Sequence, residues 1–393
     1  MTDKNRKNLY VITNGCLRRV LDTTRLIEYF KLNDCSVVEK AEDADYVIFV
    51  TCAFNKNTEE RCFEFISRFP QEKIIVMGCL PATASSRFRN SFKGKYLITK
   101  KLDEIDLLFK DFEFKFHDVP DSNFISPRNI ISLSPIDEKP SFAYLRLSRG
   151  CLGNCTYCAI RNATGKLVSK PLDICLLEYK ELLNKGYRNF VLTGEDTGAY
   201  GMDIKSSFSE LIDRLSFTDR IFKVKWCIEE FHPHWIIKYS SELLKKIKKR
   251  KITALSCTIE SGSDKILKLM NRPTSVKDAA KILLKFRKAN SGIELYTHII
   301  VGFPSETGDD FNATLALLKR VRFNMVLMLA YSDMEGTVSS AMPNKVEHKI
   351  IKERLKSAAL ILDKEGIKYG GDILKTDNGP VISNKLLSNN CPS

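Results

Sequence analysis

The sequence has no run of about 18 apolar residues, the length that a membrane-spanning helix needs. Its first residues, MTDKNRKNLYVITNG, also lack the long apolar stretch of a secretory signal peptide. We therefore predict a cytoplasmic protein with no membrane partner. Cysteines stay reduced in that compartment, so the 12 cysteines are candidates for metal ligation or burial rather than for disulfide bonds.

A second C-x2-C pair is also missing near the one dense cysteine motif, RGCLGNCTYCAI at residues 149–160. This motif sets Cys151, Cys155 and Cys158 in a C-x3-C-x2-C run. A zinc site usually takes four ligands, so three thiolates on one loop favour an iron–sulfur cluster, with a structural zinc loop as the alternative. One iron of such a cluster would have no protein ligand, and a small chelating molecule could bind there.

Acidic residues are the minority among the charged ones, with 48 Asp and Glu against 62 Lys and Arg and a formal net charge of +14. This charge permits an anionic partner such as nucleic acid, although lysine-rich surfaces are often only solvated. The basic stretch at 245–251 has the same two interpretations, an acidic-substrate dock or a solvated helix face. The length of 393 residues predicts two or three domains.

Strand and helix patterns alternate along the first part of the chain, which predicts a doubly wound parallel sheet. The expected strands are 9–13, 46–51 and 73–77, and the expected helices are 20–31, 58–69 and 102–110. Each strand ends just before a cysteine: Cys16, Cys52 and Cys79. Ligands bind at that edge of open α/β sheets, so we predict that these cysteines converge on one site. Five others are interpreted as small buried hydrophobes: Cys35, Cys62, Cys175, Cys227 and Cys257.

Strands and helices alternate again in the second part of the chain, with six expected strands. They are 142–147, 190–193, 223–227, 254–259, 293–301 and 324–330. In parallel barrels the chemistry collects at the carboxyl ends of the strands.

The C-x3-C-x2-C motif, with Tyr157 before its last cysteine, resembles that of the radical S-adenosylmethionine superfamily. The resemblance implies a [4Fe-4S] cluster at Cys151, Cys155 and Cys158, whose open iron binds the amino and carboxylate groups of S-adenosylmethionine. The six βα units fit the partial (β/α)6 barrel of these enzymes.

Further motifs resemble those of the methylthiotransferases, over about residues 9–365. NGC, VTCAFNKNTEE and MGCLPA are similar to that family's three N-terminal cysteine motifs. The run GEDTGAYG at 194–201 is similar to the signature of the branch that acts on threonylcarbamoyl-adenosine in tRNA. The resemblance implies that Cys16, Cys52 and Cys79 bind a second, auxiliary [4Fe-4S] cluster. It implies no catalytic side chain beyond the cluster ligands, and an electron donor such as flavodoxin or ferredoxin.

The resemblance also assigns cofactor-binding residues, and four positions depart from its motifs. The expected contacts to S-adenosylmethionine are Thr193, Gly194, Glu195, Asp196, Glu260, Ser261 and Tyr157. Glu260 stands where glutamine is usual, His298 where aspartate is usual, and Asp333 and Met334 where a YSPRxGT motif has proline and arginine. Losing that arginine removes a planar cation suited to phosphate or carboxylate. His298 is interpreted as a core or surface residue, with an acid–base role as the alternative.

The expected domains are 1–118 (auxiliary cluster), a proline-containing linker at 119–139, a barrel at 140–369 and a tail at 370–393. We expect no TRAM domain, the small β-barrel with which relatives bind their substrates. The chemistry implied is methylthiolation of an unactivated C–H bond through a 5′-deoxyadenosyl radical, on a peptide or another non-tRNA substrate. Two alternatives stay open: a tRNA methylthiotransferase without its accessory domain, and a non-catalytic iron–sulfur or zinc binding module.

Overall fold

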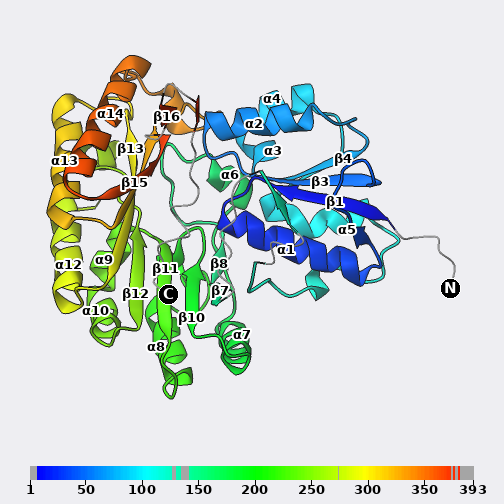
Figure 1. Cartoon of the computed structure of the whole chain (residues 1–393), viewed down its shortest axis with the longest axis horizontal. Helices are drawn as coiled ribbons and strands as arrows, with labels where there is room; N and C mark the ends of the chain where they lie inside the picture. The colour runs from blue at the N-terminus through cyan, green and yellow to red at the C-terminus, as the bar shows by residue number, and fades with distance from the viewer. Residues whose placement is uncertain are drawn as a thin grey trace. The chain divides into compact units, whose positions relative to one another are not determined.

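The computed structural model describes residues 7–125, 130–133, 141–272, 274–372, 375–376 and 379–380. The chain forms two compact units (Figure 1). The first contains Met1–Pro140, Cys158–Lys166 and Asp333–Thr337, and the second contains the rest. Each unit is built around a parallel sheet, so the prediction of an α/β fold is confirmed.

The sheet of the first unit has the order β2-β1-β3-β4-β5, with β6 paired to β1. Its strands are β1 (Asn8–Thr13), β2 (Ser36–Val37), β3 (Tyr46–Thr51), β4 (Ile74–Gly78), β5 (Tyr96–Ile98) and β6 (Ile131–Ser132). The three expected strands match β1, β3 and β4. The other three are two or three residues long, too short to show a periodic pattern. β6 lies inside the expected linker and extends the sheet, whereas 126–129 and 134–139 of that linker lie outside the described residues.

Alternation along β3 explains why helices cover both faces of this sheet. Ile48 and Val50 belong to one buried apolar cluster, while Val47 and Phe49 belong to another, as the two-residue period of a strand requires. The helices are α1 (Leu17–Leu32), α2 (Lys56–Ile66), α3 (Leu80–Thr83), α4 (Ser85–Ser91) and α5 (Ile105–Leu108). The helix expected at 102–110 is instead a 3-10 helix, η1 (Thr99–Glu104), followed by α5.

The second unit has seven parallel strands in the order β15-β14-β13-β12-β11-β10-β7. They are β7 (Phe142–Arg146), β10 (Asn189–Thr193), β11 (Lys225–Phe231), β12 (Ile252–Cys257), β13 (Glu294–Val301), β14 (Met325–Ala330) and β15 (Lys368–Gly371). Taken in the order of the sequence, the first six strands of this sheet, β7 and β10 to β14, match the six expected strands. β15 was not expected, and it reaches two residues into the expected tail, of which 373–374, 377–378 and 381–393 lie outside the described residues.

Helices lie along the outer side of this second sheet (Figure 1). The helices of the second unit are α7 (Leu172–Asn184), α8 (Phe208–Thr218), α9 (Pro233–Lys238), α10 (Ser240–Lys248), α11 (Asp264–Leu269), α12 (Val276–Ala289), α13 (Gly308–Val321) and α14 (His348–Lys364). Because all seven strands are parallel and neighbours in sequence, their carboxyl ends meet at one edge. In the described ranges no helix is long and apolar enough to cross a bilayer.

Candidate functional site

The three-cysteine loop begins at the carboxyl end of β7. It runs from the short strand β8 (Ser148–Arg149), which pairs with β9 (Val168–Ser169), to the short helix α6 (Ile160–Thr164). Cys151 and Cys155 are partly buried, and Cys158 lies two residues before α6. The loop therefore starts at the sheet edge where ligands of parallel barrels bind.

Gly153 brings the backbone against two of the loop's sulfurs. Its N–H donates a hydrogen bond to Cys151 Sγ at 3.1 Å. A Cβ at this position would lie 3.2 Å from Cys151 Sγ and 3.7 Å from Cys155 Sγ. Backbone N–H donors to cysteine sulfur are among the interactions that tune iron–sulfur clusters, so the loop fits such a group.

Glu195 fixes the start of the loop. One carboxylate oxygen accepts a hydrogen bond from the Gly150 N–H at 3.0 Å, and the other lies 3.3 Å from Arg146 Nη2. Gly150 has φ +69°, a backbone conformation that favours glycine. The carboxylate expected to accept from S-adenosylmethionine is thus already engaged in positioning the loop.

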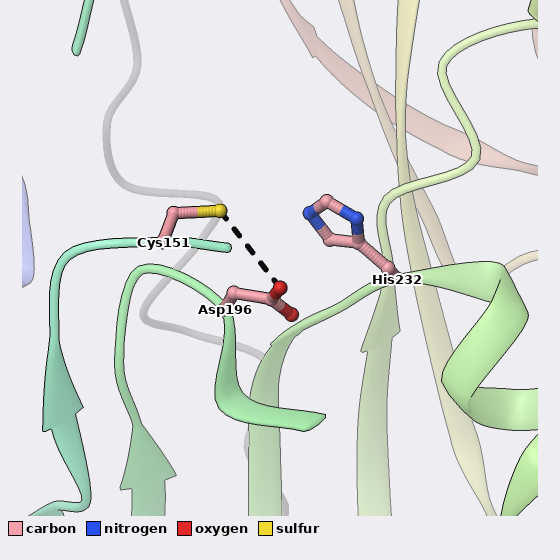
Figure 2. A group of neighbouring side chains, drawn as sticks. All are labelled: Cys151, Asp196 and His232. Carbon is pink, nitrogen blue, oxygen red and sulfur yellow. Dashed lines mark hydrogen bonds between the residues drawn. The ribbon is translucent and has the colours of Figure 1, made fainter. Parts of the chain in front are cut away.

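Asp196 and His232 face Cys151 (Figure 2). One ligand atom from each of the three lies within 4.8 Å of the other two, which holds for no other group of three in the described parts of the chain. Asp196 Oδ2 is 3.8 Å from Cys151 Sγ, and its Oδ1 accepts from Trp235 Nε1 at 2.8 Å. Burial raises the pKa of Asp196 to about 6.

Arg272 connects this group to the second cysteine of the loop. Its Nη1 lies 3.5 Å from Cys155 Sγ and 3.2 Å from His232 Nε2, and its Nη2 donates to the carbonyl and hydroxyl oxygens of Thr258. A guanidinium only donates, so His232 Nε2 accepts and its proton is on Nδ1. Burial also lowers the pKa of His232 well below its usual range, so the imidazole is neutral at pH 7. The nitrogen lone pair facing Arg272 is not free for a zinc ion.

The remaining residues expected to contact S-adenosylmethionine lie at strand ends of the same unit. Thr193 ends β10 and donates to Glu229, and the ring of Tyr157 packs against Phe303. Glu260 is buried beyond the end of β12 with φ +74°, a strained conformation for a residue with a side chain. Such strain is found most often at ligand-binding sites.

Cys16, Cys52 and Cys79 follow β1, β3 and β4 at the carboxyl edge of the first sheet. The side chains of Cys16 and Cys52 share a hydrogen bond, which holds the pKa of Cys16 well below its usual range and raises that of Cys52. Cys79 acts electrostatically on Cys52 and on Cys62, and its Sγ lies 3.6 Å from Thr99 Oγ1. Burial raises the pKa of Cys62 to about 12, so this fourth nearby thiol keeps its proton.

Several residues of these surroundings were not expected from the sequence. They are Asn14, Cys62, Arg146, Gly153, His232, Trp235 and Arg272. The sequence interpretation of Cys62 as a buried hydrophobe describes its burial but not its hydrogen bonds. One of these residues could have been found from the sequence: His232 is followed by Pro233 directly after an apolar strand, and strand ends carry the chemistry in parallel barrels.

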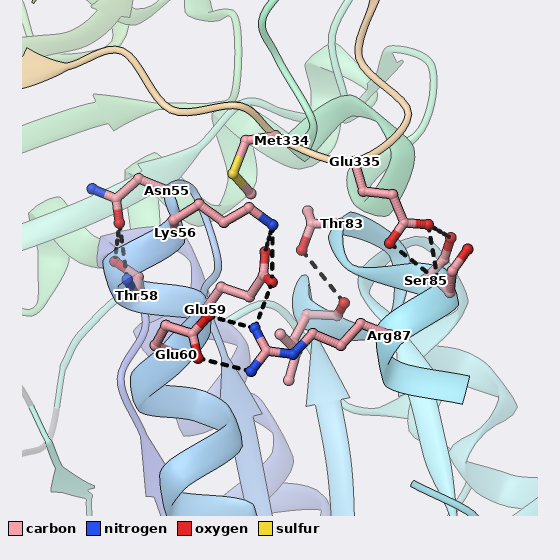
Figure 3. Close-up of polar contacts among 12 residues, drawn as sticks. Asn55, Lys56, Thr58, Glu59, Glu60, Thr83, Ser85, Arg87, Met334 and Glu335 are labelled. Carbon is pink, nitrogen blue, oxygen red and sulfur yellow. Dashed lines mark hydrogen bonds and ion pairs between the residues drawn. The ribbon is translucent and has the colours of Figure 1, made fainter. Parts of the chain in front are cut away.

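Two of the four departing positions, Asp333 and Met334, belong to the first unit, whereas Glu260 and His298 belong to the second. His298 is partly exposed on β13, and its carbonyl oxygen accepts from the Glu260 N–H. Met334 is buried, and its neighbour Glu335 accepts from the Ser86 N–H at 2.9 Å and from Ser85 Oγ at 3.1 Å (Figure 3). The segment therefore contacts Ser85 and Ser86 through a carboxylate rather than through a cation.

Comparisons with known proteins match both parts of the chain. Residues 145–318 match the Radical SAM superfamily, and residues 8–99 match the Uncharacterized protein family UPF0004. The chain is 29% identical over 361 residues to a probable threonylcarbamoyladenosine tRNA methylthiotransferase of Pyrococcus horikoshii, covering 88% of this chain and 81% of that protein. It is 28% identical over 384 residues to the ribosomal protein uS12 methylthiotransferase RimO of Chloroherpeton thalassium, covering 93% and 83%.

A solved structure shares the fold. The radical S-adenosylmethionine methyltransferase TsrM of Kitasatospora setae superposes with a TM-score of 0.56 at 12% identity, over 82% of this chain and 74% of that one. The two matched families occur in the order that the two cysteine groups predict, and the relatives align over most of the chain. The chain therefore carries a Radical SAM domain and a UPF0004 domain, and it is similar over most of its length to enzymes named methylthiotransferases.

Proposed function

We propose that this enzyme inserts a methylthio group at an unactivated C–H bond and holds two [4Fe-4S] clusters. Cys151, Cys155 and Cys158 would bind the cluster that meets S-adenosylmethionine. The first-unit cysteines Cys16, Cys52 and Cys79 would bind the auxiliary cluster. When bound, the first cluster and S-adenosylmethionine would supply the 5′-deoxyadenosyl radical that takes a hydrogen atom from carbon, and the auxiliary cluster would supply the sulfur of the methylthio group that replaces it. No side-chain base can take that hydrogen, because an unactivated C–H bond is too weakly acidic.

The position of three cysteines after parallel strands, at one edge of the first sheet, is the observation that carries the proposal. Parallel pairing aligns the ends of β1, β3 and β4, for example Thr13 with Val50 and Thr51 with Gly78. The side-chain hydrogen bond between Cys16 and Cys52 supports a shared site. Strand-end loops carry binding residues more often than inert core thiols, so these positions favour ligation over a structural role.

The chain's own residues bind and orient the cofactors. Glu195 holds the loop through the Gly150 N–H, and Gly153 leaves room beside two sulfurs. We assign S-adenosylmethionine to the strand ends that carry Thr193, Gly194, Asp196, Glu260 and Ser261, with Tyr157 on the loop. A flavodoxin or ferredoxin would supply the electron.

For the substrate we propose a peptide or another non-tRNA molecule. Met334 stands where the YSPRxGT motif has arginine, and the neighbouring Glu335 places a carboxylate on the same segment. Phosphate recognition favours guanidinium groups over thioethers and carboxylates. The uS12 methylthiotransferase among the relatives acts, by its name, on a ribosomal protein.

A tRNA substrate is the second candidate. The net charge of +14, the GEDTGAYG run and the relative from Pyrococcus horikoshii favour it. Binding to tRNA would weaken steeply with salt, since log K falls with log salt by roughly 0.7 to 0.9 for each phosphate contact. A search for methylthiolated products by mass spectrometry, with ribosomal proteins in one reaction and bulk tRNA in another, separates the two candidates.

Iron and acid-labile sulfide after anaerobic reconstitution test the reaction type. We expect about eight irons in the wild type and about four in the Cys16/Cys52/Cys79 triple alanine variant. The Cys151/Cys155/Cys158 triple alanine variant is the matched control and should also hold about four. The first variant should still form 5′-deoxyadenosine and the second should not. About four irons in the wild type would contradict the two-cluster assignment and favour a different reaction.

A further inference from the structure

We propose that Asn14, together with Cys62, is a positioning residue for the auxiliary cluster, acting through the backbone of Cys52. This inference rests on the assignment of Cys52 as a ligand in the proposed function. Neither residue is itself assigned as a ligand.

The side-chain amide of Asn14 forms hydrogen bonds with both backbone polar groups of Cys52, its N–H and its carbonyl oxygen. Asn14 follows β1 directly and is 8% exposed. Its Oδ1 accepts from the Cys52 N–H at 2.8 Å, and its Nδ2 donates to the Cys52 carbonyl oxygen at 3.3 Å. The Asn14 N–H donates to the Val50 carbonyl at 3.3 Å. Because Cys16 is only two residues further on, this contact couples the positions of two of the three sulfurs.

Cys62, on helix α2, forms hydrogen bonds with both Asn14 and Cys52. Its Sγ accepts from Asn14 Nδ2 at 3.0 Å and donates to the Cys52 carbonyl oxygen at 3.4 Å. The Cys52 N–H fixes Oδ1 as the acceptor, so Nδ2 must face Cys62 and the amide cannot flip without losing its partners. Asn14, Cys52 and Cys62 thus form a closed ring of hydrogen bonds among buried residues.

Residues that orient a metal ligand without touching the metal typically change metal affinity or activity by about 10- to 100-fold when removed. The ring would orient Cys52 before a cluster binds, because both polar atoms of its peptide group are held. Its loss should loosen the auxiliary cluster while leaving the loop at Cys151 unaffected.

Asn33 provides a matched control in the same unit. It is also 8% exposed, and it grips Phe114 in the same way, with Oδ1 accepting from the Phe114 N–H at 3.0 Å and Nδ2 donating to its carbonyl at 3.1 Å. It follows the carboxyl end of α1, whose 16 residues separate it from Cys16 by about 24 Å. Asn33→Ala should therefore remove a similar pair of side-chain hydrogen bonds without changing the surroundings of Cys16, Cys52 and Cys79.

The test is the release of iron to a ferrous chelator from the anaerobically reconstituted full-length enzyme, with the signal of the auxiliary cluster followed by EPR. We expect Asn14→Ala to release about four irons about 10- to 100-fold faster than wild type, with an altered EPR spectrum of that cluster. Asn33→Ala should release iron at the wild-type rate, although both variants unfold at a lower temperature. Cys62→Ala should accelerate release, and Cys62→Ser, which keeps a donor and an acceptor, should restore much of the wild-type rate.

Equal release from Asn14→Ala, Asn33→Ala and wild type, with eight irons present, would overturn this proposal alone. About four irons in the wild type would overturn the proposed function and this inference with it. If Asn14→Ala does not fold, the comparison of Cys62→Ala with Cys62→Ser decides, and equal rates in that pair also overturn the proposal.

Discussion

Replacing Arg272 with methionine should lower the reduction potential of the cluster at the three-cysteine loop. The buried guanidinium lies 3.5 Å from Cys155 Sγ, and a reduced cluster carries one more negative charge. One unit charge at 3.5 Å with an effective dielectric constant of about 20 contributes about 4.7 kcal/mol. At about 2.3 kcal/mol per 100 mV for one electron, this corresponds to an upper bound of about 200 mV. The added electron spreads over the whole cluster, whose irons lie farther away, so we expect about 100 mV.

The assay is an EPR-monitored redox titration in the Cys16/Cys52/Cys79 triple alanine background, where only one cluster should remain. Arg272→Lys keeps the charge and should shift the potential far less than Arg272→Met. Arg287→Met is the control for loss of a guanidinium elsewhere, because Arg287 bonds Arg322 and Asn324 in the same unit. An unchanged potential in Arg272→Met at full iron content would refute the charge argument and place Cys155 away from the cluster.

Three further predictions concern the same chain. Gly153→Ala should lower iron incorporation, because the new methyl group would lie 3.2 Å from Cys151 Sγ and crowd that sulfur, and normal iron content would contradict the fit of that loop. Tyr179→Phe should destabilise the enzyme by about 1–3 kcal/mol in chemical unfolding, because it leaves Trp226 Nε1 without its buried acceptor; a change near zero would show that the indole finds another partner. Burial alone would raise the pKa of Asp310. The hydrogen bonds that Asp310 accepts from Lys265, Ser263 and Thr307 outweigh burial and hold this pKa well below its usual range. A lowered pKa contributes stability that is lost as the pH falls below about 4, so Asp310→Asn should flatten the acid side of the stability profile, and an unaltered profile would exclude this role.

Much of the fold could be predicted because its signals are local. Apolar strands alternate with amphipathic helices, and that alternation by itself requires a parallel sheet with strand ends on one edge. The three-thiolate loop is also local, since eight consecutive residues contain all of its sulfurs. Even the separated cysteines Cys16, Cys52 and Cys79 could be related, because each follows a recognisable strand.

The short strands could not be predicted from their own residues. β2 and β6 have two residues each, and neither length shows a period of two. Their strand conformation follows from pairing with β1, which is a contact between distant segments. β15 is similar, because Gly370 and Gly371 favour no regular structure, and β14 provides the partner that makes them a strand.

The surroundings of both cysteine groups were decided by tertiary structure alone. Arg272 reaches Cys155 across 117 residues of chain, and Asn14 reaches Cys62 across 48. An arginine or asparagine has the same local propensity whether or not a sulfur faces it, so the sequence pattern contains no sign of these contacts. The sequence determined which atoms can bind iron, because that depends on residue type and spacing. The fold determined which charges and hydrogen bonds surround those atoms, because these depend on distances that only close packing sets.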